Sequence, residues 1–306
     1  MELTKDNYLS GSGSGNTWHV NVLPPKSANV GSYFEETIKS MEYVYANKTG
    51  KIHLLFSGGL DSEYVARILL HLKMDFEVVI INLKDVNGKD YNIHDTSHAF
   101  NFCNQYNITP IIYDLNFDDF VESGKLLEIA NSVECCAVEI PATAYVAAKI
   151  DGFTIMGNDP PYLRYDKGTD RWYLEELQYI HSLLRFYKRN NIIGCPFLLS
   201  YSAEQMLSFL LDPAIARLGN NLIPGKLGSN STKSHVFNNG TYFNMRTYDF
   251  SQRATSKFSG YEVIHESPIS HHPDLIIFKE LKKKWNGEYL EYYPDVVARL
   301  SNNTIY

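Results

Sequence analysis

The residues with the clearest chemical potential lie in one short stretch, Ser57-Gly-Gly-Leu-Asp-Ser62. Its two adjacent glycines let the backbone approach a ligand closely and adopt positive φ where a turn needs it. Its two serines supply hydroxyl groups. The apolar run Ile52–Phe56 before it predicts a buried parallel strand, and apolar residues at helical spacing follow it as far as Leu72. The stretch is therefore expected to be a turn between a core strand and a helix.

A turn of this kind predicts a site for an anion. The N–H groups at the start of the helix, together with the positive end of its dipole, attract a negatively charged group. The Asp61 carboxylate would repel an anion unless a cation bridges the two, as Mg²⁺ does with phosphates. A Walker A loop is excluded, because no Gly-Lys-Ser/Thr sequence follows the glycines. The alternative is an ordinary serine–glycine turn inside the core.

The composition narrows the class of protein. A chain of 306 residues can form one large or two modest domains with a substantial core. Its net charge of −7 argues against bulk electrostatic affinity for nucleic acid or an anionic membrane, although a local basic patch stays open. Four cysteines without a C-x-x-C pair suit the reducing cytoplasm. No apolar run reaches the ~18 residues of a membrane span. We therefore expect a cytoplasmic protein with no membrane partner.

The order of the expected elements predicts an α/β protein with a doubly wound parallel sheet. Strands are expected at 52–56, 76–83, 109–115 and 152–157, and they alternate with helices at about 32–47, 60–72, 95–106, 117–130 and 139–149. Ligands of such sheets bind at the carboxyl ends of the strands. Ser57 and Gly157 should both lie at that edge.

Three segments are expected along the chain. Residues 1–17 end in Ser10-Gly-Ser-Gly-Ser-Gly15, which predicts a flexible linker. Residues 18–165 would form the nucleotide-binding α/β domain, beginning with a short edge strand at 18–22. Residues 166–306 would form a helical and irregular extension that binds substrate. Within it, helices are expected near 173–190, 202–218 and 274–285, with a polar stretch at 219–240.

The stretch Ser57–Ser62 resembles the PP-loop signature S-G-G-x-D-S of the N-type ATP pyrophosphatases. This superfamily includes asparagine synthetase, GMP synthetase, NAD synthetase and 7-cyano-7-deazaguanine synthase. The resemblance covers residues 50–165, and it implies an adenine nucleotide alpha hydrolase-like fold that binds ATP and Mg²⁺. It also implies ATP cleavage between the α- and β-phosphates. The nucleotide-binding residues that we predict on this basis are Ser57, Gly58, Gly59, Asp61, Ser62, Asn82 and Gly157.

The stretch from Ile155 to Lys167 is the second candidate, because it leaves the fourth expected strand at the sheet's carboxyl edge. In asparagine synthetase a comparable strand ends in a glycine followed by acidic residues, with a lysine further on that contacts pyrophosphate. By this resemblance Gly157 and Asp159 match the glycine and the acid, and Arg164 or Lys167 takes the basic role. The alternative is an ordinary polar loop that includes Asn158. The predicted catalytic residues are therefore Asp61, which would also hold the metal, Asp159, Arg164 and Lys167.

A pair of histidines follows the second expected strand. His94 and His98 superficially resemble a zinc-binding pair, but Asp95 between them is the natural N-cap of the following helix. By the family resemblance, Asn92, His94 and Asp95 lie near the adenosine site instead.

Other candidates have simpler explanations as well. Cys103 and Cys195 are either the cysteines of a tRNA-thiolating enzyme or small core residues. Arg246, Arg253 and Lys257 either close over an anionic substrate or belong to a solvated hairpin. The lysines at 279 and 282–284 are most simply a solvated helix face, and nucleic-acid contact is their alternative.

The resemblance implies an AMP- and pyrophosphate-forming ligase or synthetase. It would adenylate an acid or carbonyl substrate, which a nitrogen or other nucleophile then attacks. The acceptor is an unidentified small molecule, and the net charge does not favour tRNA. Two alternatives stay open, a non-catalytic module that binds adenine nucleotides and a tRNA-modifying or sulfur-transfer enzyme. The pattern leaves the oligomeric state open.

Overall fold

The structure is a computed structural model. It describes residues 9–14, 17–22, 29–135, 137–158, 162–166, 171–177, 179–213, 215, 229–245, 269, 271–285 and 288–292.

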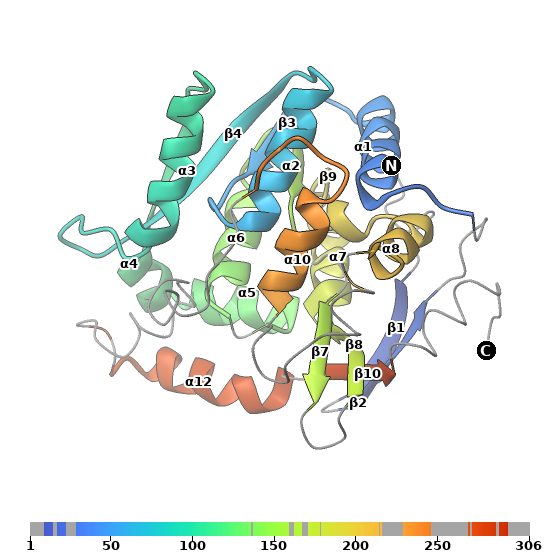
Figure 1. The fold of residues 1–306 in the computed structure, drawn as a ribbon. Coiled ribbons are helices and arrows are strands. Elements are labelled where there is room, and N and C mark those ends of the chain that lie inside the picture. The colour runs from blue at the N-terminus through green and yellow to red at the C-terminus, as the bar shows by residue number, and fades with distance from the viewer. Residues whose placement is uncertain are drawn as a thin grey trace.

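A parallel sheet of five strands forms the centre of the described chain (Figure 1). Neighbouring strands are parallel in every pair, in the order β5-β4-β3-β6-β9. Four of them confirm the predicted strands, and the two-residue β9 adds a fifth at one edge. The strands are β3 (Ile52–Leu55), β4 (Phe76–Lys84), β5 (Ile111–Asn116), β6 (Phe153–Met156) and β9 (Gly194–Cys195).

Helices cover both faces of this sheet, which confirms the predicted α/β class. The chain runs from β3 through β4 to β5 in one direction, and then from β6 to β9 in the other. Right-handed crossovers therefore place α2 and α3 on one face and α5, α6 and α7 on the other. In agreement, α5, α6 and α7 contact one another, and α1 contacts α2. These helices are α1 (Tyr33–Asn47), α2 (Leu60–His71), α3 (Ile93–Gln105), α5 (Lys125–Val133), α6 (Glu139–Ala147) and α7 (Tyr179–Arg189).

Two expected helices of the α/β part and its extension are interrupted. The helix predicted over 117–130 is divided into α4 (Phe117–Glu122) and α5, because Gly124 adopts a left-handed conformation with φ 72°. The helix predicted over 202–218 begins as expected, with the Ser202 hydroxyl accepting a hydrogen bond from the Gln205 N–H. However, α8 (Ala203–Leu210) ends early, since Pro213 disfavours helical backbone at the residue before it.

The prediction of a helix over 173–190 is wrong in its first part. Residues Arg171–Leu177 form the strand β8, and α7 begins only at Tyr179. The spacing of Leu174 and Leu177 fits a helix, but the preceding Trp-Tyr pair favours a strand. Pairing decides between the two, because β8 lies between β7 (Tyr162–Asp166) and β10 (Glu288–Tyr292) in an antiparallel sheet of three strands.

The N-terminal segment forms a hairpin in part. Residues Leu9–Ser14 form β1, which pairs antiparallel with β2 (Thr17–Val22). The structure thus has a strand within the segment 1–17, where the sequence predicts a flexible linker. The predicted edge strand at 18–22 is confirmed as β2.

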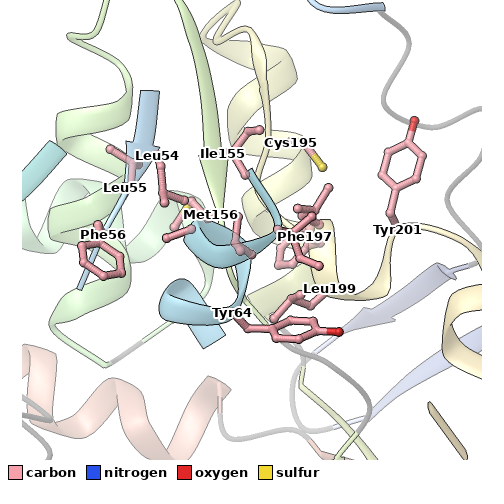
Figure 2. Packing of buried hydrophobic residues seen from close by; sticks show 14 of the residues in the cluster. Leu54, Leu55, Phe56, Tyr64, Ile155, Met156, Cys195, Phe197, Leu199 and Tyr201 are labelled. Atoms are coloured by element: carbon pink, nitrogen blue, oxygen red, sulfur yellow. The ribbon is translucent and has the colours of Figure 1, made fainter. Parts of the chain in front are cut away.

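Helix α10 (Ser229–Asn238) was not predicted, because its sequence is polar and rich in weak helix formers. Packing stabilises it instead. The Phe237 ring stacks on Tyr64 of α2, with ring centroids 4.2 Å apart, and both rings lie beside Tyr33 of α1. Tyr64 belongs to the same core cluster as Leu54 of β3 and Ile155 of β6 (Figure 2). The aromatic contacts therefore join α10 to the core of the sheet.

We expect Phe237→Ala to lower the free energy of unfolding by about 3–5 kcal/mol, the usual cost of removing a large buried ring. Chemical denaturation followed by circular dichroism measures this difference. His235→Ala on the exposed side of α10 is the matched control and should change stability by less than ~0.5 kcal/mol. Equal effects of the two substitutions would show that α10 is not held by its aromatic contact.

Candidate functional site

The loop from Ser57 to Gly59 connects β3 to α2 at the carboxyl edge of the sheet. Gly58 has a φ of 76°, and a Cβ atom there would lie 2.5 Å from the Asp95 carbonyl oxygen and 2.6 Å from the Ala99 nitrogen. Glycine is therefore required at position 58 by the close packing of α3 and by the left-handed backbone conformation of the residue.

Gly59 differs from its neighbour. Its φ of −73° is ordinary, and the closest atom to an added Cβ would be the Ser57 Oγ at 3.2 Å. Gly59 is the N-cap of α2, and it provides no side-chain cap for the first-turn N–H groups. In the described part of the chain, the loop thus offers backbone donors and the positive end of a helix dipole to an anion.

The two serines of the Ser57–Ser62 stretch have different environments: Ser57 lies in the loop and Ser62 in the first turn of α2. Ser62 is buried, and its hydroxyl donates to the Gly59 carbonyl at 3.0 Å. Ser57 is exposed, and its Oγ accepts a hydrogen bond from the Gly59 N–H at 3.2 Å. The two hydroxyl oxygens are 3.2 Å apart. Ser62 therefore braces the loop, and Ser57 presents a hydroxyl at its surface.

The end of β6 packs directly on this loop. A Cβ atom at Gly157 would lie 2.7 Å from the Asp61 carbonyl oxygen and 2.8 Å from the Ser62 nitrogen. Since β3 and β6 are neighbours, Ser57 and Gly157 lie at the carboxyl ends of adjacent strands, as predicted. This pair of strands is also where the chain reverses its direction across the sheet, the usual ligand position in open α/β sheets.

A lysine from a distant part of the chain completes the group. The Lys233 Nζ of α10 lies 2.6 Å from the Asp61 Oδ2, and the Lys233 side chain is only 3% exposed. The other carboxylate oxygen, Oδ1, is buried and has no hydrogen-bond partner in the described structure. Lys233 was not predicted, because the surrounding Ser-Thr-Lys-Ser sequence shows neither a known motif nor a clear helical period.

Contacts at its C-terminal end fix the helix α10 that carries Lys233. At the C-terminal end of the helix, the Asn239 amide donates to both oxygens of Asp212 at 3.0 Å. Asn238 exchanges two hydrogen bonds with the backbone of Met245. These hydrogen bonds join the end of α10 to Asp212 and to the segment that follows the helix, while the Phe237 stack on Tyr64 holds α10 against α2 (Figure 1).

Asn82 lies at the same edge of the sheet. It follows Val79, the register partner of Leu55, by three residues along β4. Its amide nitrogen donates to Asp114 at 3.0 Å, while its Oδ1 is buried and has no hydrogen-bond partner among the described residues. The side chain thus has one unsatisfied acceptor, and its contact with a nucleotide stays a prediction.

The second predicted loop is described only in part. Asn158 follows Gly157, and its amide lies 4.0 Å from the Met156 sulfur. Asp159 and Lys167 lie outside the described residues. Arg164 lies in β7, in register with Tyr173, and β7 contacts α10. The fold therefore brings the strand of Arg164 next to the helix of Lys233.

The histidine pair has no support as a zinc site. His94 and His98 are exposed, and the described residues contain no group of three His, Cys, Asp or Glu placed to bind a metal. The prediction of Asp95 as N-cap is wrong, because α3 begins at Ile93 with Asn92 in the cap position. The Asn92 side chain accepts from the Leu83 N–H and donates to the Ile81 carbonyl, both at 2.9 Å, so it joins α3 to β4.

Cys103 and Cys195 are buried free cysteines in different parts of the fold. Cys103 lies on α3, which packs on β4, whereas Cys195 lies in the edge strand β9. Burial raises the pKa of the Cys103 thiol to about 11 and that of Cys195 to about 12. Both are therefore neutral thiols near pH 7, which supports the interpretation as core residues.

The remaining candidates are the basic residues near the C-terminal end of the sequence. Arg246, Arg253 and Lys257 lie outside the described residues. The lysines at 279 and 282–284 lie on α12 (Pro273–Trp285), which confirms the predicted helix, but their side chains are not among those described. None of the helices in the described ranges has the length and apolar character needed to cross a membrane.

Comparison with known proteins found distant structural similarity only. No protein-family model matches the chain, and no curated protein sequence matches it. Two of the solved structures that match are of proteins named for tRNA modification. A predicted subunit of a tRNA methyltransferase from Methanocaldococcus jannaschii is 19% identical, with a TM-score of 0.31, over 52% of this chain and 72% of that chain. The U34-tRNA thiolase NcsA from Methanococcus maripaludis, solved with its [4Fe-4S] cluster, is 15% identical, with a TM-score of 0.34, over 81% and 79%.

The loop geometry predicts different defects for substitutions at Gly58 and at Gly59. Gly59→Val should leave the protein folded and abolish ATP binding, because the added side chain meets only Ser57 and occupies the space in front of the helix. Gly58→Ala should instead lower the melting temperature, because its Cβ meets the backbone of α3. Calorimetric titration with MgATP and thermal melting measure the two effects. Normal ATP affinity in folded Gly59→Val would show that the anion binds elsewhere.

The cysteine environments predict low reactivity in the folded state. At pH 8, iodoacetamide should label Cys103 and Cys195 at least ~10²-fold more slowly than in the unfolded chain, because the thiolate fraction falls about tenfold per pH unit of pKa increase. Mass spectrometry of the two peptides separates these residues from Cys135 and Cys136. Rapid labelling of Cys103 or Cys195 in the folded protein would contradict their interpretation as core residues and favour sulfur transfer.

Proposed function

We propose that this chain binds MgATP at the Ser57–Ser62 loop and cleaves it to AMP and pyrophosphate while activating an acceptor. The observation that carries the proposal is the convergence of three groups at one sheet edge. These are a loop in which a Cβ atom at Gly59 would meet only the Ser57 hydroxyl, a helix N-terminus without a side-chain cap, and the Asp61–Lys233 pair. Together they match the chemistry of a polyphosphate with its metal.

The phosphates would lie against the loop and the first turn of α2. Backbone N–H groups of that turn and the exposed Ser57 hydroxyl supply hydrogen-bond donors. Lys233 adds a positive charge from the other side, where its ammonium already lies beside the loop. Arg164, Asp159 and Lys167 remain proposed contributors from the second loop. Asn82 and Gly157 remain proposed contacts to the nucleotide.

Asp61 fits a magnesium ion. Its Oδ1 is a buried acceptor without a hydrogen-bond partner in the described structure, and carboxylate oxygens are the ligands that Mg²⁺ prefers. A single protein carboxylate is sufficient, since Mg²⁺ usually completes its octahedron with substrate phosphates and water. When bound there, the metal would neutralise charge that develops on the pyrophosphate.

The direction of cleavage follows from where positive groups and donors lie. The β- and γ-phosphates are the natural occupants of the loop, since its donors and Lys233 stabilise the charge of a departing pyrophosphate. The α-phosphorus would then face the open carboxyl edge, where an acceptor oxygen can attack. Positioning and charge stabilisation are sufficient for this step, so no side-chain nucleophile is required. We propose an acid or carbonyl acceptor, whose adenylate a nitrogen or other nucleophile then attacks.

A non-catalytic module that binds adenine nucleotides is the alternative from another class. A tRNA-modifying enzyme is the other alternative, and it would use tRNA as the acceptor. The buried thiols of Cys103 and Cys195 do not support direct sulfur transfer by such an enzyme.

The products of turnover test the proposal. Incubation with MgATP and a panel of carboxylic acids, amines and a tRNA pool should yield AMP and pyrophosphate with the correct acceptor, as resolved by ion-exchange chromatography. ADP as the main product would contradict cleavage at the α-phosphate. Intact ATP with every acceptor, despite tight binding, would favour the non-catalytic module.

Asp61→Asn should slow this reaction by at least ~10²-fold, the effect of losing one preorganised charge-stabilising group. The affinity for ATP should fall much less, because the carboxylate and its metal matter most as charge develops. Asp75→Asn, at an exposed position before β4, is the matched control and should turn over normally. A variant that loses ATP binding and turnover in equal measure would give Asp61 a binding role only.

A further inference from the structure

The Asp61 carboxylate has a cationic partner within the chain itself. The Lys233 ammonium lies 2.6 Å from Oδ2, and 21% of the Asp61 side chain is exposed against 3% of the Lys233 side chain. Asp61 is also the group that fits Mg²⁺. A protein cation and the metal would therefore compete for the same carboxylate.

We propose that Lys233 is an internal counter-ion that excludes Mg²⁺ from Asp61 until ATP arrives, and that it moves from Asp61 to the phosphates when MgATP binds. This inference rests on the proposed function of the Ser57–Ser62 loop. It adds a coupling between metal and nucleotide that the loop residues alone do not require.

The charge balance of the site supports this exchange. Binding of Mg²⁺ alone would place a divalent cation beside the carboxylate that already neutralises the buried Lys233 ammonium, and a further anion would relieve the repulsion between the two cations. ATP supplies that anion, since its phosphates can accept Lys233 and share the metal with Asp61 at the same time. Metal and nucleotide should therefore strengthen each other's binding, and this coupling is reciprocal.

The side chain can make this move without a change of fold. Helix α10 is held by the Phe237 stack and by the Asn239–Asp212 and Asn238–Met245 hydrogen bonds. The ammonium, in contrast, stands on a flexible four-carbon stem with three rotatable donors. A rotamer change is sufficient to transfer it from the carboxylate to an anion in front of α2.

Titration of the protein with Mn²⁺, followed by its electron paramagnetic resonance signal, tests the proposal without nucleotide. Lys233→Met retains the apolar stem and removes the charge, so it should bind Mn²⁺ at least ~5-fold more tightly than the unmodified chain. The double variant Asp61→Asn/Lys233→Met should lose this gain. Lys188→Met, at an exposed position of α7, is the matched control and should leave Mn²⁺ affinity unchanged.

The melting temperatures of the single and double variants provide a second test, which remains informative if a variant folds poorly. Asp61→Asn leaves the buried ammonium without its carboxylate, so its melting temperature should fall by at least ~3 °C. Adding Lys233→Met should recover most of that loss. Independent effects of the two substitutions, or unchanged Mn²⁺ affinity in folded Lys233→Met, would overturn the counter-ion. Failure of the unmodified chain to bind ATP, with the Mn²⁺ gain intact, would instead refute the proposed function alone.

Discussion

The candidate site depends on one ion pair between parts of the chain 172 residues apart, Asp61 and Lys233. Burying an ammonium is costly unless an opposite charge lies close to it, and removing one partner of such a pair is strongly destabilising. The pair therefore constrains both of these parts of the chain. It holds α10 against the first turn of α2, and it places a buried positive charge beside the loop.

Close backbone contacts provide the second constraint. The absence of a side chain at Gly58 lets α3 pack against one side of the loop, and the absence of one at Gly157 lets the end of β6 pack against the other side. A side chain at either position would separate these elements by more than the packing tolerates. These two glycines thus set the packing on both sides of the site, whereas a Cβ atom at Gly59 would meet only the Ser57 hydroxyl, at 3.2 Å.

The core unites the sheet with part of the extension. A single cluster of buried side chains includes residues from Tyr33 to Met245, on both sides of the expected boundary at 165/166. Buried polar groups contribute as well, since Gln205 of α8 bonds to Ser40 and Thr37 of α1. Helices α8 and α10 consequently position the site together with the sheet, which explains how a lysine far along the chain reaches the loop.

Local sequence determined the order of strands and helices and the position of the Ser57–Ser62 loop. A buried parallel strand needs a continuous apolar run, and a strand-to-helix turn needs glycine, so both features are visible in a few adjacent residues. For the same reason the sequence located Ser57 and Gly157 at one edge. The tertiary structure decided what depends on distant partners. The strand β8 exists through its pairing with β7 and β10, and α10 exists through its packing on Tyr64. Lys233 could not be recognised in advance, because the carboxylate that the fold places beside it lies 172 residues away in the sequence.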